Sequence, residues 1–352
     1  MSEALTFLLY STTICLLLHM LACAVFPNFK LLDKPEKYGL KRKPLPYPTG
    51  IASVIAFILM FTVAQTPLSF QAKGLLLGIG LLTFTSIIDD IKSLPAWARL
   101  LIQALIAFII FAAGTRIYTI TNPLGGIIKL DTIDIHPALL TTHYSLLTKI
   151  GPLPFASGLF TIAWLLLTTN SFNWLDGIPG QVSILSFIGG ITLGILALSS
   201  RVDQPEIAII SFIVAGIALG SAVFDLPPNK TVMGDTGAMF FGLMLGTISI
   251  YAGGKVATAL LVMGVPLIDA ALVTTKRIIK GRSPLKGGRD HLHHMLIDNR
   301  QWTESQVILL TAALGTSFGV SALFMSTLGK FAAIVLLGIV MLLITRYASK
   351  KN

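Results

Sequence analysis

Long apolar runs separated by short polar stretches make up most of the chain. A transmembrane helix needs about 20 mostly apolar residues, within a range of about 17 to 25. The candidate segments are residues 5–26, 50–66, 74–88, 99–114, 152–170, 181–199, 205–223, 236–253, 256–274, 305–326 and 329–346. Two or three of them are short, so the pattern predicts an all-α polytopic membrane protein with 10–11 transmembrane helices.

Composition supports the membrane class. Of the 352 residues, 54% are hydrophobic and only 12% are charged, and the mean hydropathy is +0.81. Soluble domains carry about 25% charged residues. The two cysteines, Cys15 and Cys23, both lie in the first apolar segment, so no disulfide framework is expected. We expect a single integral membrane domain over residues 1–352, with 5–26 retained as a helix.

The net charge of +10 could indicate a nucleic-acid partner, but its distribution argues for membrane orientation instead. If the N-terminus lies outside and eleven spans follow, 19 of the 26 lysines and arginines fall on the inner side. An excess of basic residues on the cytoplasmic side is the positive-inside rule. The sequence therefore predicts an outside N-terminus, a lipid bilayer partner and no nucleic acid. The same charge suits anionic lipid and phosphorylated substrates.

The longest predicted outer segment, residues 115–150, lies between spans 4 and 5. Polar and apolar residues alternate over 116–121 and 127–135, and the sequence Asn-Pro-Leu-Gly-Gly at 122–126 separates the two stretches. Alternation around a Pro-Gly turn is typical of a β-hairpin. We therefore expect a small extracytoplasmic β-hairpin here.

Four polar clusters fall at the inner ends of odd-numbered spans. They are Asp89-Asp90, Asn170-Ser171-Phe172-Asn173 running into Asp176, Gly234-Asp235-Thr236-Gly237, and His291-Leu292-His293-His294. Ionisable groups at membrane depth are costly unless they pair, bind a metal or line an aqueous cavity. Because these spans end on the same side, we expect the clusters to converge, as in a metal-dependent active site.

The neighbouring carboxylates Asp89 and Asp90 repel each other, which raises one pKa or recruits a cation. Hard oxygen ligands favour Mg²⁺ or Mn²⁺ over zinc. One of the two could also act as a general base. The alternative is a solvated helix end with Lys92 as its counter-ion. For Asp235, the alternatives are a helix cap and contact with a cation.

Asn170, Asn173 and Asp176 are spaced three residues apart and share one helix face, which suits a polar head group. The alternative is helix capping followed by a turn. Asp269, inside an apolar span, either pairs with Lys276 or Arg277 or supports the site.

The histidine cluster is preceded by Lys286 and Arg289, which suits hydrogen bonds to an anionic ligand such as phosphate. Zinc motifs such as His-Glu-x-x-His place their histidines four apart, a spacing that this cluster does not have. A surface loop is the remaining alternative.

In this order, the clusters resemble the polyprenyl-phosphate N-acetylhexosamine-1-phosphate transferase family (glycosyltransferase family 4). The matching motifs are Asp89-Asp90 with Leu94-Pro95 and Arg99-Leu100, Asn170-x-x-Asn173-x-x-Asp176-Gly177, Gly234-Asp235-Thr236-Gly237, Pro266-x-x-Asp269 and Asp290-His291-Leu292-His293-His294. The form of the histidine motif resembles the N-acetylglucosamine-type branch more than the muramoyl-pentapeptide branch.

The resemblance implies a Mg²⁺-dependent phosphotransferase, with Mn²⁺ as the alternative ion. It implies transfer of N-acetylglucosamine-1-phosphate from a UDP-sugar to undecaprenyl phosphate at the cytoplasmic face of the bacterial inner membrane. That reaction releases UMP and starts cell-envelope polysaccharide synthesis. Paired protomers are also implied.

The resemblance assigns roles residue by residue. Catalytic roles go to Asp89 as base, Asp90, Asp176 and His291; metal contacts go to Asp90, Asp176 and Asp235; and substrate contacts go to Lys43, Asn170, Asn173, Arg289, His293 and His294.

One departure from the family is Pro179, where a second aspartate is usual. It motivates the alternative of a catalytically weakened member that binds lipid or nucleotide. Donor specificity of the muramoyl-pentapeptide type is another alternative. A membrane transporter is the rival from a different class, but transporters place polar groups near the midplane, often with inverted repeats. Here the clusters sit at one interface.

Overall fold

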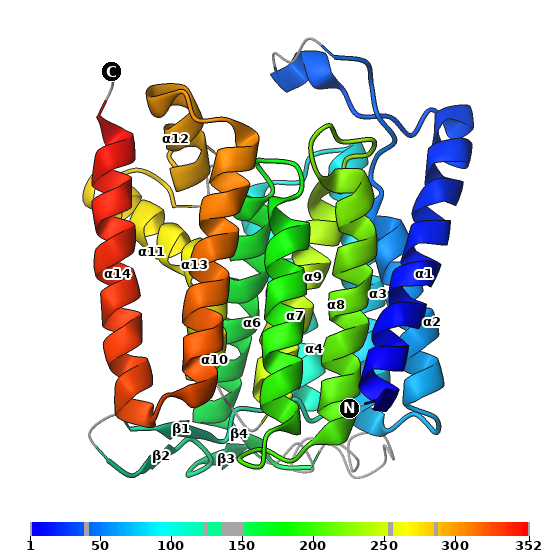
Figure 1. Cartoon of the computed structure of the whole chain (residues 1–352). Coiled ribbons are helices and arrows are strands. Elements are labelled where there is room, and N and C mark those ends of the chain that lie inside the picture. The colour runs from blue at the N-terminus through cyan, green and yellow to red at the C-terminus, as the bar shows by residue number, and fades with distance from the viewer. Residues whose placement is uncertain are drawn as a thin grey trace.

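The computed structural model describes residues 2–38, 42–122, 125–135, 151–252, 256–284 and 288–350. Figure 1 shows long helices side by side, with short strands at one end of the bundle and α12 at the other. The long elements are α1 (Ser2–Val25), α2 (Gly50–Ala64), α3 (Phe70–Ile91), α4 (Ala96–Ala112), α6 (Phe155–Leu175), α7 (Gln181–Leu198), α8 (Pro205–Asp225), α9 (Gly234–Tyr251), α11 (Gly264–Ile279), α13 (Glu304–Phe324) and α14 (Thr327–Ser349). The shorter ones are η1 (Phe26–Phe29), η2 (Pro35–Tyr38), α10 (Val256–Val262) and α12 (Leu292–Arg300).

Within the described ranges, seven helices are long and apolar enough to cross a membrane: α1, α3, α6, α7, α8, α13 and α14. The pair α10 and α11 would make an eighth if it counts as one span. This result is consistent with the predicted all-α polytopic membrane protein. It is a smaller number than the predicted 10–11, partly because α2 and α4 have only 15 and 17 residues.

The predicted ninth span, residues 256–274, is not one straight helix, which corrects the expectation. The chain bends by 86° between α10 and α11. Pro266 has no N–H to donate to the carbonyl of Val262 four residues earlier, so the helical hydrogen-bond pattern is interrupted at this point. The bend turns α11 across the bundle.

Close helix packing depends on glycine pairs spaced four residues apart. Gly242 and Gly246 lie on α9 where it meets α6, and a Cβ at Gly242 would lie 2.5 Å from the Thr168 carbonyl oxygen. A Cβ at Gly246 would lie 2.4 Å from the Thr168 hydroxyl. Small residues at this spacing let helix backbones approach closely in membranes. The two helices are therefore held in one register.

The peripheral helices present apolar side chains outward. On α14, for example, Leu336, Ile339 and Leu343 are all exposed. Extended exposed apolar surface marks an interaction site, and on a bundle of this composition it fits contact with lipid.

Two short antiparallel strand pairs connect α4 to α6. β1 (Thr119–Thr121) pairs with β2 (Ile127–Lys129), and β3 (Asp134–Ile135) pairs with β4 (Leu153–Pro154). In Figure 1 both pairs lie at the end of the bundle opposite α12. Residues 123–124 and 136–150 of the predicted outer segment lie outside the described residues.

Candidate active site

The end of α3 and the start of α4 are joined through Asp89. One carboxylate oxygen accepts the Leu94 backbone N–H at 2.6 Å, and the other accepts the Arg99 guanidinium at 2.9 Å. Only 8% of the Asp89 side chain is exposed. Both Asp89 oxygens are therefore engaged, and Arg99 is held at the helix end.

Arg99 also reaches the start of α9. Its Nη1 lies 3.6 Å from Asp235 Oδ2, and the Asn173 amide at the end of α6 donates to the same oxygen at 3.4 Å. Asp235 follows Gly234, which has a φ of +76° that favours glycine. Three helix ends thus meet at one carboxylate. Arg99 was recognised in the sequence only as part of a motif, without a role.

The second aspartate, Asp90, faces a different set of partners. The Tyr47 hydroxyl donates to Asp90 Oδ1 at 2.5 Å, and the Thr236 hydroxyl donates to Oδ2 at 3.4 Å. Sequence reasoning missed Tyr47 because a single tyrosine in a proline-rich loop carries no pattern. The loop before α2 therefore contributes to the site.

Asp176 directly follows α6 and is half-buried beside other acids. Burial raises the pKa of its carboxyl well above the usual value, and the negative charges of Asp225, Asp235 and Asp90 raise it further. Asp225, at the end of α8, accepts a hydrogen bond from the Ser183 hydroxyl at 2.7 Å. Asp225 is a further acid that sequence reasoning missed. In the sequence, Asp225 stands out only as a single carboxylate at the end of an apolar run.

Asp269 on α11 positions the histidine cluster. It accepts a hydrogen bond from the Leu292 backbone N–H at 2.9 Å, and its other oxygen lies 2.7 Å from His291 Nδ1. Arg277, one of its two expected partners, instead pairs with Asp290 at 3.3 Å. Asp269 thus fixes His291 at the start of α12, which is the contact that the second expectation, support of the site, requires.

His293 and His294 lie directly over Gly177. A Cβ there would lie 2.2 Å from His293 Nε2 and 2.9 Å from His294 Cε1, so only glycine fits. Burial lowers the pKa of His293 well below its usual value, with further lowering by the neighbouring His294, His291 and Arg289. Burial is also the largest cause that lowers the pKa of His294 to about 4. Both rings are therefore neutral near pH 7.

His293 Nε2 is buried and has no hydrogen-bond partner among the described atoms. A buried polar nitrogen without a partner is costly. Because it lies against Gly177, next to Asp176, the nitrogen is in place to bond a ligand there.

Other predicted site residues are not drawn into this network. Asn170 donates to Gln103 on α4 at 2.7 Å. Arg289 makes a two-point ion pair with exposed Asp298, at 2.8 and 2.7 Å. Lys43 is exposed, and its carbonyl accepts from Arg42. Lys286 lies outside the described residues.

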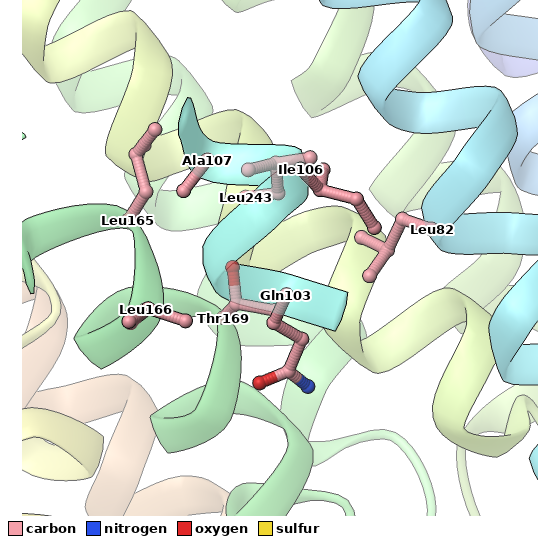
Figure 2. A pocket seen from close by; sticks show the side chains of 8 residues that line it. All are labelled: Leu82, Gln103, Ile106, Ala107, Leu165, Leu166, Thr169 and Leu243. Atoms are coloured by element: carbon pink, nitrogen blue, oxygen red, sulfur yellow. The ribbon is translucent and has the colours of Figure 1, made fainter. Parts of the chain in front are cut away.

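A small pocket lies beneath this network, between α3, α4, α6 and α9. Figure 2 shows the side chains that line it, which are apolar apart from Gln103 and Thr169. The lining residues are Leu82, Gln103, Ile106, Ala107, Leu165, Leu166, Thr169 and Leu243. A second pocket shares Leu82 and Gln103 and extends to Asp89 and Arg99. Each has a volume of about 10 Å³, which is room for about one water molecule.

The donor set fits a hard divalent cation. Asp89, Asp90, Asp176 and Asp235 lie close enough to influence one another, and Arg99 bridges only two of them. Across the described residues, no three His, Cys, Asp or Glu side chains form a complete metal-binding group. Mg²⁺ needs no such group, because it typically takes one or two carboxylates together with substrate phosphates and water.

Comparison with known proteins agrees with the motifs. The sequence profile described as glycosyl transferase family 4 matches residues 72–253. A probable undecaprenyl-phosphate N-acetylglucosaminyl 1-phosphate transferase of Bacillus subtilis is 24% identical over 302 residues, covering 84% of this chain and 77% of the relative. A decaprenyl-phosphate N-acetylglucosaminephosphotransferase of Mycolicibacterium smegmatis is 27% identical, with coverages of 90% and 81%.

The undecaprenyl-phosphate alpha-N-acetylglucosaminyl 1-phosphate transferase of Escherichia coli K12 is 26% identical, with coverages of 87% and 80%. The profile match spans more than half of the 352 residues and contains the first three polar clusters. The chain therefore belongs to glycosyl transferase family 4.

Proposed function

We propose that this chain is a Mg²⁺-dependent enzyme, with Mn²⁺ as the alternative ion. It transfers N-acetylglucosamine-1-phosphate from a UDP-sugar to undecaprenyl phosphate and releases UMP. The names of the relatives support the sugar phosphate and the polyprenyl phosphate acceptor. The product would start synthesis of a cell-envelope polysaccharide.

The observation that carries this proposal is the meeting of α3, α4, α6 and α9 at Asp235. Arg99 and Asn173 both contact its Oδ2, and Asp89 and Asp90 lie beside it. A cluster with more acids than bases attracts a divalent cation, and the cation in turn attracts the phosphates of both substrates. Transfer between two anionic reactants needs this arrangement because they otherwise repel each other.

Asp90 and Asp235 are the proposed metal ligands, with Asp176 next to them. Mg²⁺ bound there would neutralise charge that develops on the donor phosphates. Asp89 stays the proposed base, but both of its oxygens are already engaged by Leu94 and Arg99. Asp90 Oδ2 has only the 3.4 Å contact with Thr236, so Asp90 is the second candidate for contact with the acceptor phosphate.

His293 and His294 are the proposed donors to the sugar or to phosphate oxygens, since a neutral imidazole has one N–H to donate. In His291 the Asp269 carboxylate lies beside Nδ1 and fixes how that ring is oriented, so the N–H of a neutral ring is directed at Asp269 and Nε2 is left as an acceptor. His293 Nε2 lies against Gly177, next to Asp176, and has no hydrogen-bond partner among the described atoms. Asn173 orients the donor from α6.

The site belongs at the cytoplasmic face of the bacterial inner membrane in this proposal. The basic excess on that side supports the orientation, with the N-terminus and the β1–β2 pair outside. There the lipid tail of the acceptor stays in the bilayer while its phosphate meets the carboxylates. Pairing of two protomers is part of the same proposal.

The test is an assay of UMP release by purified protein with undecaprenyl phosphate, Mg²⁺ and a panel of UDP-sugars. We expect release only when lipid, metal and UDP-N-acetylglucosamine are all present. Asp235→Asn should abolish it, whereas Asp203→Asn, an exposed control between α7 and α8, should not. Turnover retained by Asp235→Asn would remove Asp235 from the metal site. Absence of UMP with every donor would refute the transferase.

A further inference from the structure

We propose that Tyr47 is a positioning residue for Asp90, which makes the loop of residues 42–49 a working part of the site. The inference rests on the proposed function, because it assumes that Asp90 contacts the metal or a phosphate. It begins from the 2.5 Å hydrogen bond between the Tyr47 hydroxyl and Asp90 Oδ1. None of the motifs in the sequence includes this tyrosine.

The loop is anchored at its outer edge by Asp33. The Arg42 guanidinium donates to both Asp33 oxygens, at 3.2 and 2.6 Å. The backbone N–H of Leu45 donates to Asp33 Oδ1 at 2.7 Å, and the Asp33 N–H donates back to the Leu45 carbonyl at 2.9 Å. A two-point Arg–carboxylate pair fixes geometry as well as charge. The loop therefore has a defined path before it reaches Tyr47.

Its inner edge is joined to the segment that leads into α9. Val232 donates its N–H to the Pro46 carbonyl and accepts the Thr49 N–H, both at 3.0 Å. The Tyr47 ring lies against Gly234, where a Cβ would come within 2.7 Å of a ring carbon. The ring thus occupies space that Gly234 leaves free, one residue before Asp235.

These anchors make Tyr47 a rigid link between two metal-site carboxylates. Its ring is fixed by the backbone beside Asp235, and its hydroxyl fixes Asp90 on α3. The other Asp90 oxygen has only the 3.4 Å contact with Thr236, so the phenol supplies the shorter hydrogen bond. Partners that orient a metal-binding carboxylate typically contribute about 10- to 100-fold in metal affinity or activity.

Tyr47→Phe is the decisive variant, because it keeps the ring against Gly234 and removes only the hydroxyl. Tyr251→Phe is the matched control: its hydroxyl also makes a side-chain hydrogen bond, at 3.0 Å to Thr115, away from the carboxylates. Two quantities are measured: steady-state UMP release against Mg²⁺ concentration, and the rise in melting temperature that Mn²⁺ or Mg²⁺ causes without substrate.

We expect Tyr47→Phe to melt like the wild type in EDTA. Its apparent affinity for Mg²⁺ or its kcat should fall by about 10- to 100-fold. Tyr251→Phe should match the wild type in both measurements. A Tyr47→Phe variant with wild-type kcat and wild-type affinity for Mg²⁺ would overturn the inference, as would one that is merely less stable in EDTA.

The two proposals fail in different ways. If the wild-type protein releases no UMP, the proposed function fails, while the metal-induced melting shift still compares Tyr47→Phe with the wild type. If the wild type is active and the two variants behave alike in both measurements, only the role of Tyr47 fails.

Discussion

Arg99 offers a direct test of how the acidic cluster is stabilised. Its Nη1 lies 2.9 Å from Asp89 Oδ2 and 3.6 Å from Asp235 Oδ2. Replacing it with methionine keeps much of the side-chain volume but leaves both carboxylates without their cation. Removing one partner of a buried ion pair costs about 3–5 kcal/mol. Because 33% of the Arg99 side chain is exposed, we expect about 2–3 kcal/mol.

A loss of this size changes the unfolding equilibrium by about 30- to 150-fold. We expect the loss to be largest in EDTA and smaller with excess MgCl₂, because a bound divalent cation replaces part of the missing positive charge. The assay is thermal unfolding of purified protein in detergent, followed by tryptophan fluorescence under both conditions. Arg201→Met is the control, since Arg201 is exposed and donates to the Leu323 and Met325 carbonyls.

Two results would refute this reasoning. One is an Arg99→Met variant that melts with the wild type in EDTA. The other is a loss of stability that is the same with and without Mg²⁺. The first result would mean that Arg99 does not hold the carboxylates together in the absence of metal, and the second would mean that a divalent cation does not replace the charge of Arg99.

Three further predictions concern the elements around the cluster. Asp269→Asn should lower kcat by about 10- to 100-fold with little change in melting temperature, because His291 loses the carboxylate that orients its ring. Steady-state kinetics would check this, and an unchanged kcat would contradict it. Gly242→Leu should prevent stable folding, since the new side chain would meet the Thr168 carbonyl; monodisperse protein on size-exclusion chromatography would argue against it. The pKa of His294 is lowered to about 4, so unfolding takes up a proton between about pH 6.5 and 4, and stability should fall as the pH drops through that range. In melting curves, His294→Gln should weaken this pH dependence, and an unchanged slope would exclude His294 as its source.

The sequence located the polar clusters well because each one interrupts an apolar span, where charge is costly. The count of spans placed the ends of these clusters on one side of the membrane, so the clusters were expected to meet. In the structure Asp235 contacts Arg99 and Asn173, and Gly177 lies against His293 and His294. What each side chain touches was harder to predict. Asn170 shares a helix face with Asn173 but turns to Gln103, a partner that only the packing of α4 against α6 reveals.

The bend at Met263 and the role of Tyr47 were missed for different reasons. Pro266 is a visible signal of a break, but it lies inside an apolar run whose length favours a single span. Tyr47 gave no comparable signal, because its partner lies 43 residues away and is brought near by a loop without regular structure. Long-range contacts of that kind depend on the whole fold.

The pair Gly242 and Gly246 has a consequence for how the site can evolve. The distance between Asn173 on α6 and Asp235 on α9 depends on how closely the two helices pack. That packing is set by the missing side chains of Gly242 and Gly246, which lie 7 and 11 residues after Asp235. Because this spacing depends on backbone packing, substitutions of side chains that face the substrate can alter which molecule is recognised without changing the distance between α6 and α9. A mutation that adds even one methyl group between α6 and α9 would instead shift Asn173 and Asp235 relative to each other.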